Sequence, residues 1–117
     1  MSDKTAIIRD RNDAFRSRDP LDAVPGRYVV TPGVIDLLER HAGYEINDVF
    51  TEVALFKDFN QDNDPHGEHD FGIIDFLGER LFWKIDYYDT QYRYGSPDPS
   101  DILKTCRVLT VMLAHEY

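Results

Sequence analysis

The chain has 117 residues and a formal net charge of −9, and 42% of its residues are hydrophobic. This length suits one globular domain over residues 1–117, and the apolar content excludes a disordered chain. Residues 41–117 hold fifteen acidic and six basic side chains, whereas residues 1–40 hold seven of each, so the negative charge belongs to the later part and disfavours nucleic acid and membranes as direct partners.

The N-terminal segment, MSDKTAIIRDRNDAFRSR, predicts a weakly amphipathic helix over residues 3–17, with Ser2 as its N-cap and an end before Pro20. Its charges exclude the apolar centre of a signal peptide, and no segment of the chain has the ~20 apolar residues of a membrane span. We therefore expect a cytoplasmic protein.

The next segments predict a strand, a helix and a second strand. RYVVT at residues 27–31 is rich in β-branched and aromatic residues, which favour a strand. Residues 31–43 predict a helix that begins at the cap Thr31 and ends at Gly43. Apolar alternation over residues 49–59 predicts a half-buried strand, although the pattern is also compatible with a helix.

The segments FGIIDF and RLFWKIDYY flank LGE and predict a β-hairpin. A two-residue loop of Gly78 and Glu79 in a type II′ turn would pair Leu77 with Arg80. Side-chain alternation then gives the sheet a core face and a mixed face. The predicted core face holds Ile74, Phe76, Leu81, Trp83, Ile85 and Tyr87, and the mixed face holds His69, Phe71, Ile73, Asp75, Phe82, Lys84, Asp86 and Tyr88.

The end of the chain predicts a loop over residues 89–99 and a helix over residues 100–117, which would cross the apolar face of the sheet. Cys106 lies within this apolar pattern and is the one cysteine of the chain, which favours a buried structural thiol. The elements together predict an α+β fold of order α-β-α-β-β-β-α. We expect an antiparallel sheet with helices mainly on one face and an acidic turn at its rim.

Several strings of the chain resemble one family of small bacterial proteins. They are NDAFR, TPGV, FNQDNDPHGEHDFG, FWKIDYYD, GSPDP and RVLTVMLAHEY, and they extend from Asn12 to Tyr117. The chain is similar over this length to the proteins grouped as domain of unknown function 3768. The resemblance implies a stand-alone bacterial domain whose genes often travel on mobile elements, and it implies no particular chemistry.

The most unusual stretch is DFNQDNDPHGEHDFG, residues 58–72, which contains five acidic residues, two histidines and no lysine or arginine. Its start resembles a calcium loop, but Asn63 and His69 occupy the positions where an EF-hand needs glycine and glutamate. His66, His69 and Asp70 are candidate ligands of a transition metal. The competing interpretation is that these side chains only cap a turn, with Asp64 as an acceptor and Gly67 at positive φ.

An enzyme is one of two functional interpretations. The predicted hairpin places His69 opposite Tyr88 and diagonal to Asp86, with Lys84 one step further, so an acid/base cluster is conceivable. The enzyme hypothesis, with or without a divalent metal, therefore centres on His66, His69, Asp70 and Asp86. Pairing of Lys84 with a neighbouring carboxylate is also how an ordinary sheet neutralises its polar face.

The other interpretation is an acidic interaction protein, and we rank it above catalysis because it needs only charge and aromatic rings. Its partner would be a protein with a basic surface, and a nucleic-acid mimic with a counter-defence role is its most specific form. It requires no cofactor. The candidate binding residues are Asp58, Asp62, Asp64, His66, Glu68, His69, Asp70, Lys84, Asp86 and Tyr88.

Overall fold

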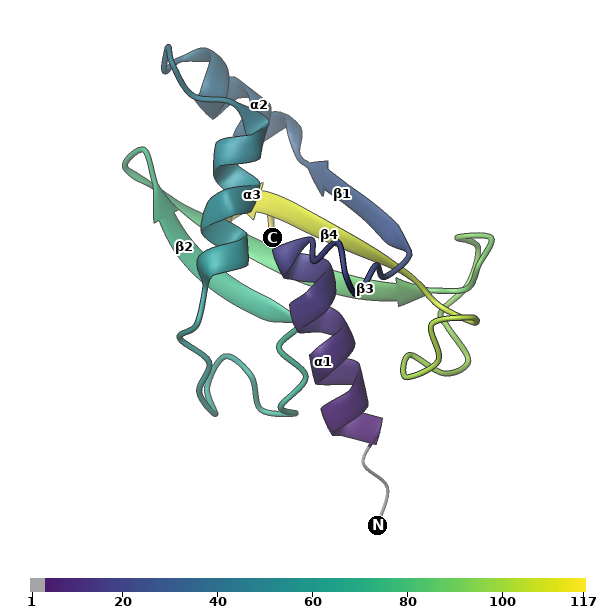
Figure 1. Cartoon of the computed structure of the whole chain (residues 1–117). Helices are drawn as coiled ribbons and strands as arrows, with labels where there is room; N and C mark the ends of the chain where they lie inside the picture. Colours follow the sequence, from purple (N-terminus) through teal and green to yellow (C-terminus); the bar gives the residue numbers. More distant parts are fainter. Residues whose placement is uncertain (1–3) are drawn as a thin grey trace.

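A computed structural model describes residues 4–117 and shows three helices against a four-stranded sheet (Figure 1). The predicted α+β class is confirmed. The elements in chain order are α1 (Lys4–Ser17), β1 (Gly26–Val30), α2 (Pro32–Glu39), α3 (Ile46–Leu55), β2 (Phe71–Phe76), β3 (Glu79–Tyr88), β4 (Cys106–Leu113) and a short 3₁₀ helix, η1 (Ala114–Glu116). The predicted cap Ser2 lies outside the described residues.

The strands follow the order β1-β4-β3-β2, so β1 and β2 are the two edges of the sheet. The sheet is mixed, and not purely antiparallel as predicted, because β1 runs parallel to β4 while the other two pairs are antiparallel. A parallel pair needs a long connection between its strands, and here that connection contains α2, α3, β2 and β3.

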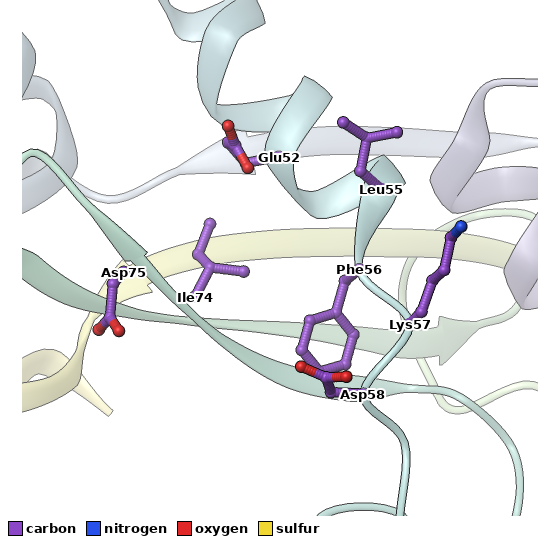
Figure 2. A pocket seen from close by; sticks show the side chains of 7 residues that line it. All are labelled: Glu52, Leu55, Phe56, Lys57, Asp58, Ile74 and Asp75. Atoms are coloured by element: carbon purple, nitrogen blue, oxygen red, sulfur yellow. The ribbon is translucent and has the colours of Figure 1, made fainter.

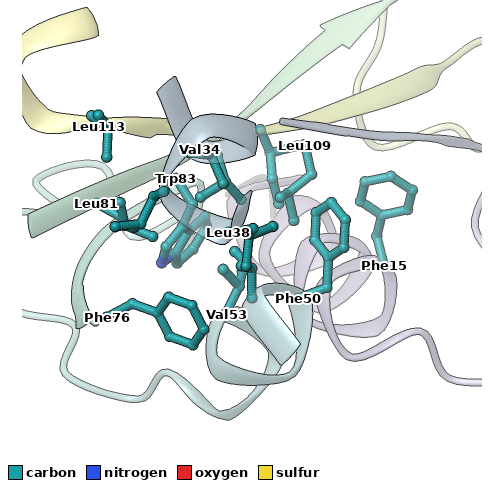
Figure 3. Packing of buried hydrophobic residues seen from close by; sticks show 14 residues of the cluster. Phe15, Val34, Leu38, Phe50, Val53, Phe76, Leu81, Trp83, Leu109 and Leu113 are labelled. Atoms are coloured by element: carbon teal, nitrogen blue, oxygen red, sulfur yellow. The ribbon is translucent and has the colours of Figure 1, made fainter. Parts of the chain in front are cut away.

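The helices lie against one face of the sheet, where the core forms (Figures 1 and 3). Trp83 is fully buried at its centre and is surrounded by side chains from α2, α3, β2 and β4. No long helix of the described residues covers the opposite face. None of the helices in residues 4–117 combines the length and the apolar composition needed to cross a membrane.

The strand predicted over residues 49–59 is wrong, because most of this segment belongs to helix α3. Val49 and Val53 are both fully buried, and their spacing of four places them on one side of a helix. Glu45 and Asp48 form a capping box that fixes the start of α3. The apolar alternation at Val53 and Leu55 is misleading because Leu55 is 63% exposed.

The helix predicted over residues 100–117 is also wrong, because residues 106–113 form strand β4 at the centre of the sheet. Leu109 and Val111 face the core, while Met112 on the opposite side is 5% exposed. A central strand that is buried on both faces shows a continuous apolar run, which imitates a buried helix. Cys106 is buried as predicted.

The hairpin is confirmed, but its register differs from the predicted one by two residues. Leu77 and Gly78 form the turn with φ values of 53° and 80°, which is the positive pair of a type I′ turn and not the predicted type II′ turn. Phe76 therefore pairs with Glu79. A shift of two residues keeps the side chains of the paired residues on their predicted faces.

Close packing explains this register. Gly72 lies opposite Trp83, and a Cβ atom at Gly72 would overlap the indole ring. The ring therefore uses the space that glycine leaves.

Thr31 precedes α2 as predicted, but its hydroxyl makes no capping bond to the helix. Instead it donates to Glu116 Oε1 at 2.6 Å, and Glu116 Oε2 accepts from Gly33 N at 3.1 Å. The C-terminal end of the chain thus caps α2.

Candidate functional site

The acidic loop, residues 58–70, holds its shape mainly by its own hydrogen bonds. Asp64 is 9% exposed, and its Oδ1 accepts the backbone N–H groups of Glu68 at 3.0 Å and His69 at 3.1 Å. Gly67 has a φ of 71°. The turn-capping interpretation therefore describes Asp64 and Gly67, and the Asp64 carboxylate faces the inside of the loop.

His69 anchors the loop to α1, and its predicted position opposite Tyr88 is wrong. The imidazole stacks on Phe59 with ring centroids 3.8 Å apart, and its Nδ1 lies 2.9 Å from Asp13 Oδ1. Its Nε2 lies 3.7 Å from Asp64 Oδ2. The observed register no longer brings Tyr88 opposite His69, and the φ of 57° at His69 lies outside the extended conformation of a strand.

Glu68 belongs to a buried polar network that the sequence did not reveal. The Tyr87 hydroxyl donates to Glu68 Oε1 at 2.7 Å, and Asn12 Nδ2 donates to the Tyr87 oxygen at 2.8 Å and to the Glu68 carbonyl at 2.9 Å. Arg107 Nε donates to Asn12 Oδ1 at 2.6 Å. Burial is the main cause that raises the pKa of Tyr87, so its phenol stays protonated. The network joins α1, the acidic loop, β3 and β4.

The predicted metal ligands do not assemble into a metal site. Within residues 4–117, no three His, Cys, Asp or Glu side chains form a group that could hold a metal ion. His66 is exposed, whereas His69 faces Asp13 and Asp64. The structure therefore separates the roles of these two histidines.

Three predicted residues, Asp70, Lys84 and Asp86, meet in a pocket of about 340 Å³ on the open face of the sheet. Lys84 Nζ lies 2.9 Å from Asp86 Oδ2, and the hydrogen bond that Lys84 donates to this carboxylate raises the pKa of Lys84. Burial, with Glu68 nearby, raises the pKa of Asp70. We call this hollow the polar pocket; its other lining residues are Asn63, Pro65, Phe71, Ile85 and Tyr117.

Tyr88 does not reach the polar pocket. It lies at the end of β3, where its ring centroid is 6.5 Å from that of Tyr92. The lining of the pocket includes neither His66 nor His69. The four residues of the predicted acid/base enzyme therefore do not share one hollow.

A second hollow, of about 310 Å³, lies between the C-terminal end of α3 and strand β2 (Figure 2). Leu55, Phe56 and Ile74 supply its apolar surface. We call it the acidic groove because its charged lining consists of Glu52, Lys57, Asp58 and Asp75. Asp58 is the one predicted binding residue among them.

Sequence reasoning missed Glu52 and Asp75 for different reasons. Glu52 was assigned to a strand, whereas it extends from α3 one turn after Asp48. Asp75 was placed correctly on the mixed face, but nothing in the sequence shows that β2 is an edge strand. The spacing of Asp48 and Glu52 along a helix is the signal that could have found an acidic face.

The two hollows lie on either side of β2. The acidic groove contains Asp58, whereas the polar pocket contains Asp70 and Asp86. Asp62 and His66 are exposed in the loop and line neither hollow. Carboxylates therefore flank the β2 edge from both faces of the sheet.

Comparison with known proteins gives one match. A family model with the description "Protein of unknown function (DUF3768)" matches residues 30–116. No curated protein and no solved structure matches the chain. The matched residues include α2, α3, strands β2 to β4, the acidic groove and all lining residues of the polar pocket except Tyr117.

Proposed function

The chain belongs to the DUF3768 family, and we propose that it is a small acidic interaction protein of the cytoplasm that binds a protein partner with a basic surface. The acidic groove is the observation that supports this proposal best. It combines an apolar floor with three carboxylates and one lysine, Lys57, as Figure 2 shows. A lysine or arginine side chain needs both features, because its alkyl stem packs on apolar surface while its charged end seeks a carboxylate.

The carboxylates of the groove are available to a partner. Within residues 4–117, neither Glu52 nor Asp58 forms a salt bridge. Asp75 lies 3.7 Å from Arg80, and both side chains are largely exposed. Such an exposed pair stabilises the fold by at most about 1 kcal/mol, so a partner can replace it at little cost.

The apolar floor adds contact energy to the charge. Leu55 is 63% exposed at the end of α3, which leaves a large aliphatic side chain in water next to the groove. Burial of apolar surface contributes about 25 cal/mol per Å². A partner that covers Leu55 and pairs with Glu52 and Asp58 would therefore gain both hydrophobic and electrostatic free energy.

The test begins with capture of partners on the immobilised protein, followed by affinity measurements with the purified partner. The double substitution Glu52→Gln and Asp58→Asn should weaken binding at least about tenfold, or about 1.4 kcal/mol. Wild-type affinity should fall as salt is raised, because the Debye length shrinks from about 10 Å at 0.1 M to 3 Å at 1 M.

The matched control is the double substitution Asp10→Asn and Glu39→Gln. It makes the same change in charge at exposed positions on α1 and α2, and neither residue lines the groove. Equal weakening by both variants would mean that net charge alone drives binding. No weakening by either variant would overturn the proposal.

The narrower hypothesis is that the acidic surface imitates nucleic acid. It predicts that the captured partner also binds DNA or RNA through the same basic surface, and that added nucleic acid displaces the protein in proportion to its own affinity. A partner that binds both ligands at once would refute the mimic and leave the interaction intact.

A further inference from the structure

Among the strands of residues 4–117, β3 is the only partner of β2 in the sheet, so that β2 has one edge without a neighbouring strand in this part of the chain. In an antiparallel pair, alternate residues point their N–H and C=O groups toward the partner strand or away from it. The two-residue turn makes Phe76 and Glu79 a hydrogen-bonded pair, and the ladder then continues through Ile74 and Gly72. The bond from Ile85 N to the Asp70 carbonyl, at 2.8 Å, extends the same series.

It follows that Phe71, Ile73 and Asp75 direct their backbone groups outward. Within residues 4–117, no hydrogen bond outside the sheet ladder involves the backbone N–H of any of the three. Three donors and three acceptors therefore form a row along the edge. Such a row is a template for another strand.

The side chains of β2 protect this edge poorly. Proteins usually guard an exposed edge with lysine, proline or several charges. FGIIDF contains one charged residue, Asp75, and Ile73 is 39% exposed on the open face. The segment thus combines strand propensity with accessible backbone groups.

We propose that an extended, basic segment of the partner adds to the β2 edge as a fifth strand. This inference rests on the proposed function and specifies how the partner binds. Side chains of an added strand alternate between the two faces of the sheet. On the helix side they would enter the acidic groove near Glu52 and Asp58, and on the open side they would pass Asp75.

The charge around β2 favours a basic segment of a partner over a second copy of this chain as the added strand. A second copy of the chain would bring another net charge of −9 to the carboxylates around β2, and repulsion between like charges would oppose the pairing. A segment with alternating lysine or arginine residues meets these carboxylates with opposite charge. The other edge strand, GRYVV, contains Arg27 and no carboxylate, so a basic segment favours β2.

The first test uses the full chain and a capped ten-residue peptide of alternating lysine and valine. NMR titration should shift the amide signals of Phe71, Ile73 and Asp75, and their hydrogen exchange should slow in the complex. The matched control peptide has the same sequence with N-methyl groups on alternate residues, in two versions that cover both registers. Only every second N–H of the added strand faces β2. The version whose methyl groups replace these donors should therefore bind at least about tenfold more weakly, and the version whose methyl groups face away should bind as the unmethylated peptide does.

The second test uses the protein variant Ile73→Pro, with Ile73→Val as its control. The Ile73 N–H points away from β3, so proline removes an edge donor without breaking the β2–β3 ladder. The proline variant should lose at least about tenfold in affinity for the unmethylated peptide, and the valine variant should bind as the wild type does. If Ile73→Pro fails to fold, the methylated peptides decide the question on the wild-type chain.

The outcomes separate this inference from the proposed function. If Glu52→Gln with Asp58→Asn weakens the peptide while methylation does not, the acidic groove binds basic ligands without strand addition and the inference is overturned. If methylation weakens binding and the charge variant does not, the edge accepts strands but the proposed basic partner is wrong. Protection of the three amides that grows with protein concentration alone would instead identify a second copy as the occupant, and this too would overturn the inference.

Discussion

Asn12 is the residue whose substitution tests the buried network most directly. It is fully buried, and its side chain makes hydrogen bonds to Arg107, to the Tyr87 hydroxyl and to the Glu68 carbonyl. Asn12→Ala would leave the Glu68 carbonyl and Arg107 Nε without their partner at a fully buried position, while Tyr87 keeps its bond to Glu68 and Arg107 keeps its bond to the Pro99 carbonyl. An unsatisfied neutral group costs about 1–3 kcal/mol and a charged group more, so we expect a loss of roughly 3–5 kcal/mol.

Urea denaturation measures this loss. With an m-value of about 2 kcal/mol per M, the midpoint should fall by roughly 2 M. The matched control is Asn47→Ala, because Asn47 also accepts a hydrogen bond from an arginine, Arg18, at 2.6 Å, but on the surface. The control should cost less than about 1 kcal/mol. Equal and small effects at the two positions would refute the claim that the network stabilises the fold.

Two further predictions concern the sheet and the polar pocket. Gly72→Ala should destabilise the protein by about 2 kcal/mol or more, because its Cβ would overlap the Trp83 indole. The control Gly95→Ala, whose Cβ would have no atom closer than 4.0 Å, should change the melting temperature little. Equal shifts in melting temperature for the two variants would contradict the proposed packing. Burial raises the pKa of Asp70 in the folded chain above its value in the unfolded chain. Between these two pKa values, the folded chain binds more protons than the unfolded chain. The stabilising effect of this group is therefore complete below the ordinary pKa of aspartate, and it is lost as pH rises through the folded-state pKa. Asp70→Asn should therefore gain stability relative to the wild type as pH rises from acid to neutral in urea denaturation, and a difference that does not change with pH would contradict this sign.

Local patterns predicted those parts of the fold that local chemistry determines. The helix start at Thr31 and Pro32 follows from cap preferences, and the two faces of the hairpin follow from period-two alternation. The hairpin register depends on a contact between Gly72 and Trp83 across the strands. Such a contact has no signature in either segment alone.

The errors come from burial, which the sequence shows only indirectly. Strand β4 has apolar residues on both faces because it lies in the middle of the sheet, and its position there depends on pairing with β1, about eighty residues earlier in the chain. Helix α3 was ambiguous because a short amphipathic helix and a half-buried strand share some apolar positions. In both cases the tertiary neighbours decide the secondary structure.

Some residues of the candidate site are also predictable from local sequence, whereas others depend on distant contacts. The exposed carboxylates Asp58 and Asp62 are predictable from composition, since no side chain or backbone group in the described part of the chain bonds to them. The position of the His69 side chain depends on its contact with Asp13, which lies 56 residues earlier on α1. Long-range contacts of this kind give several candidate binding residues a structural role within the fold.

One turn of α1 contacts both the acidic loop and the end of α3, which lines the acidic groove. Asp13 holds the loop through His69, while Arg16 Nη1 donates to the carbonyls of Val53 at 2.8 Å, Ala54 at 3.1 Å and Phe56 at 2.9 Å. These carbonyls belong to the end of α3, where an unpaired C=O group needs a donor. Arg16 is therefore a buried cap for the helix that supplies the groove with Leu55 and Phe56.

This arrangement bears on how salt dependence should be interpreted. Burial lowers the pKa of Arg16, but an arginine remains charged at neutral pH, and buried interactions are screened by salt much less than exposed ones. The walls of the groove should thus keep their shape at an ionic strength that weakens contacts between Glu52 or Asp58 and a partner. Unchanged near-UV circular dichroism between 0.1 and 1 M salt, together with a steep loss of affinity, would assign the salt effect to the interface; a change in the spectrum would assign it to the groove itself.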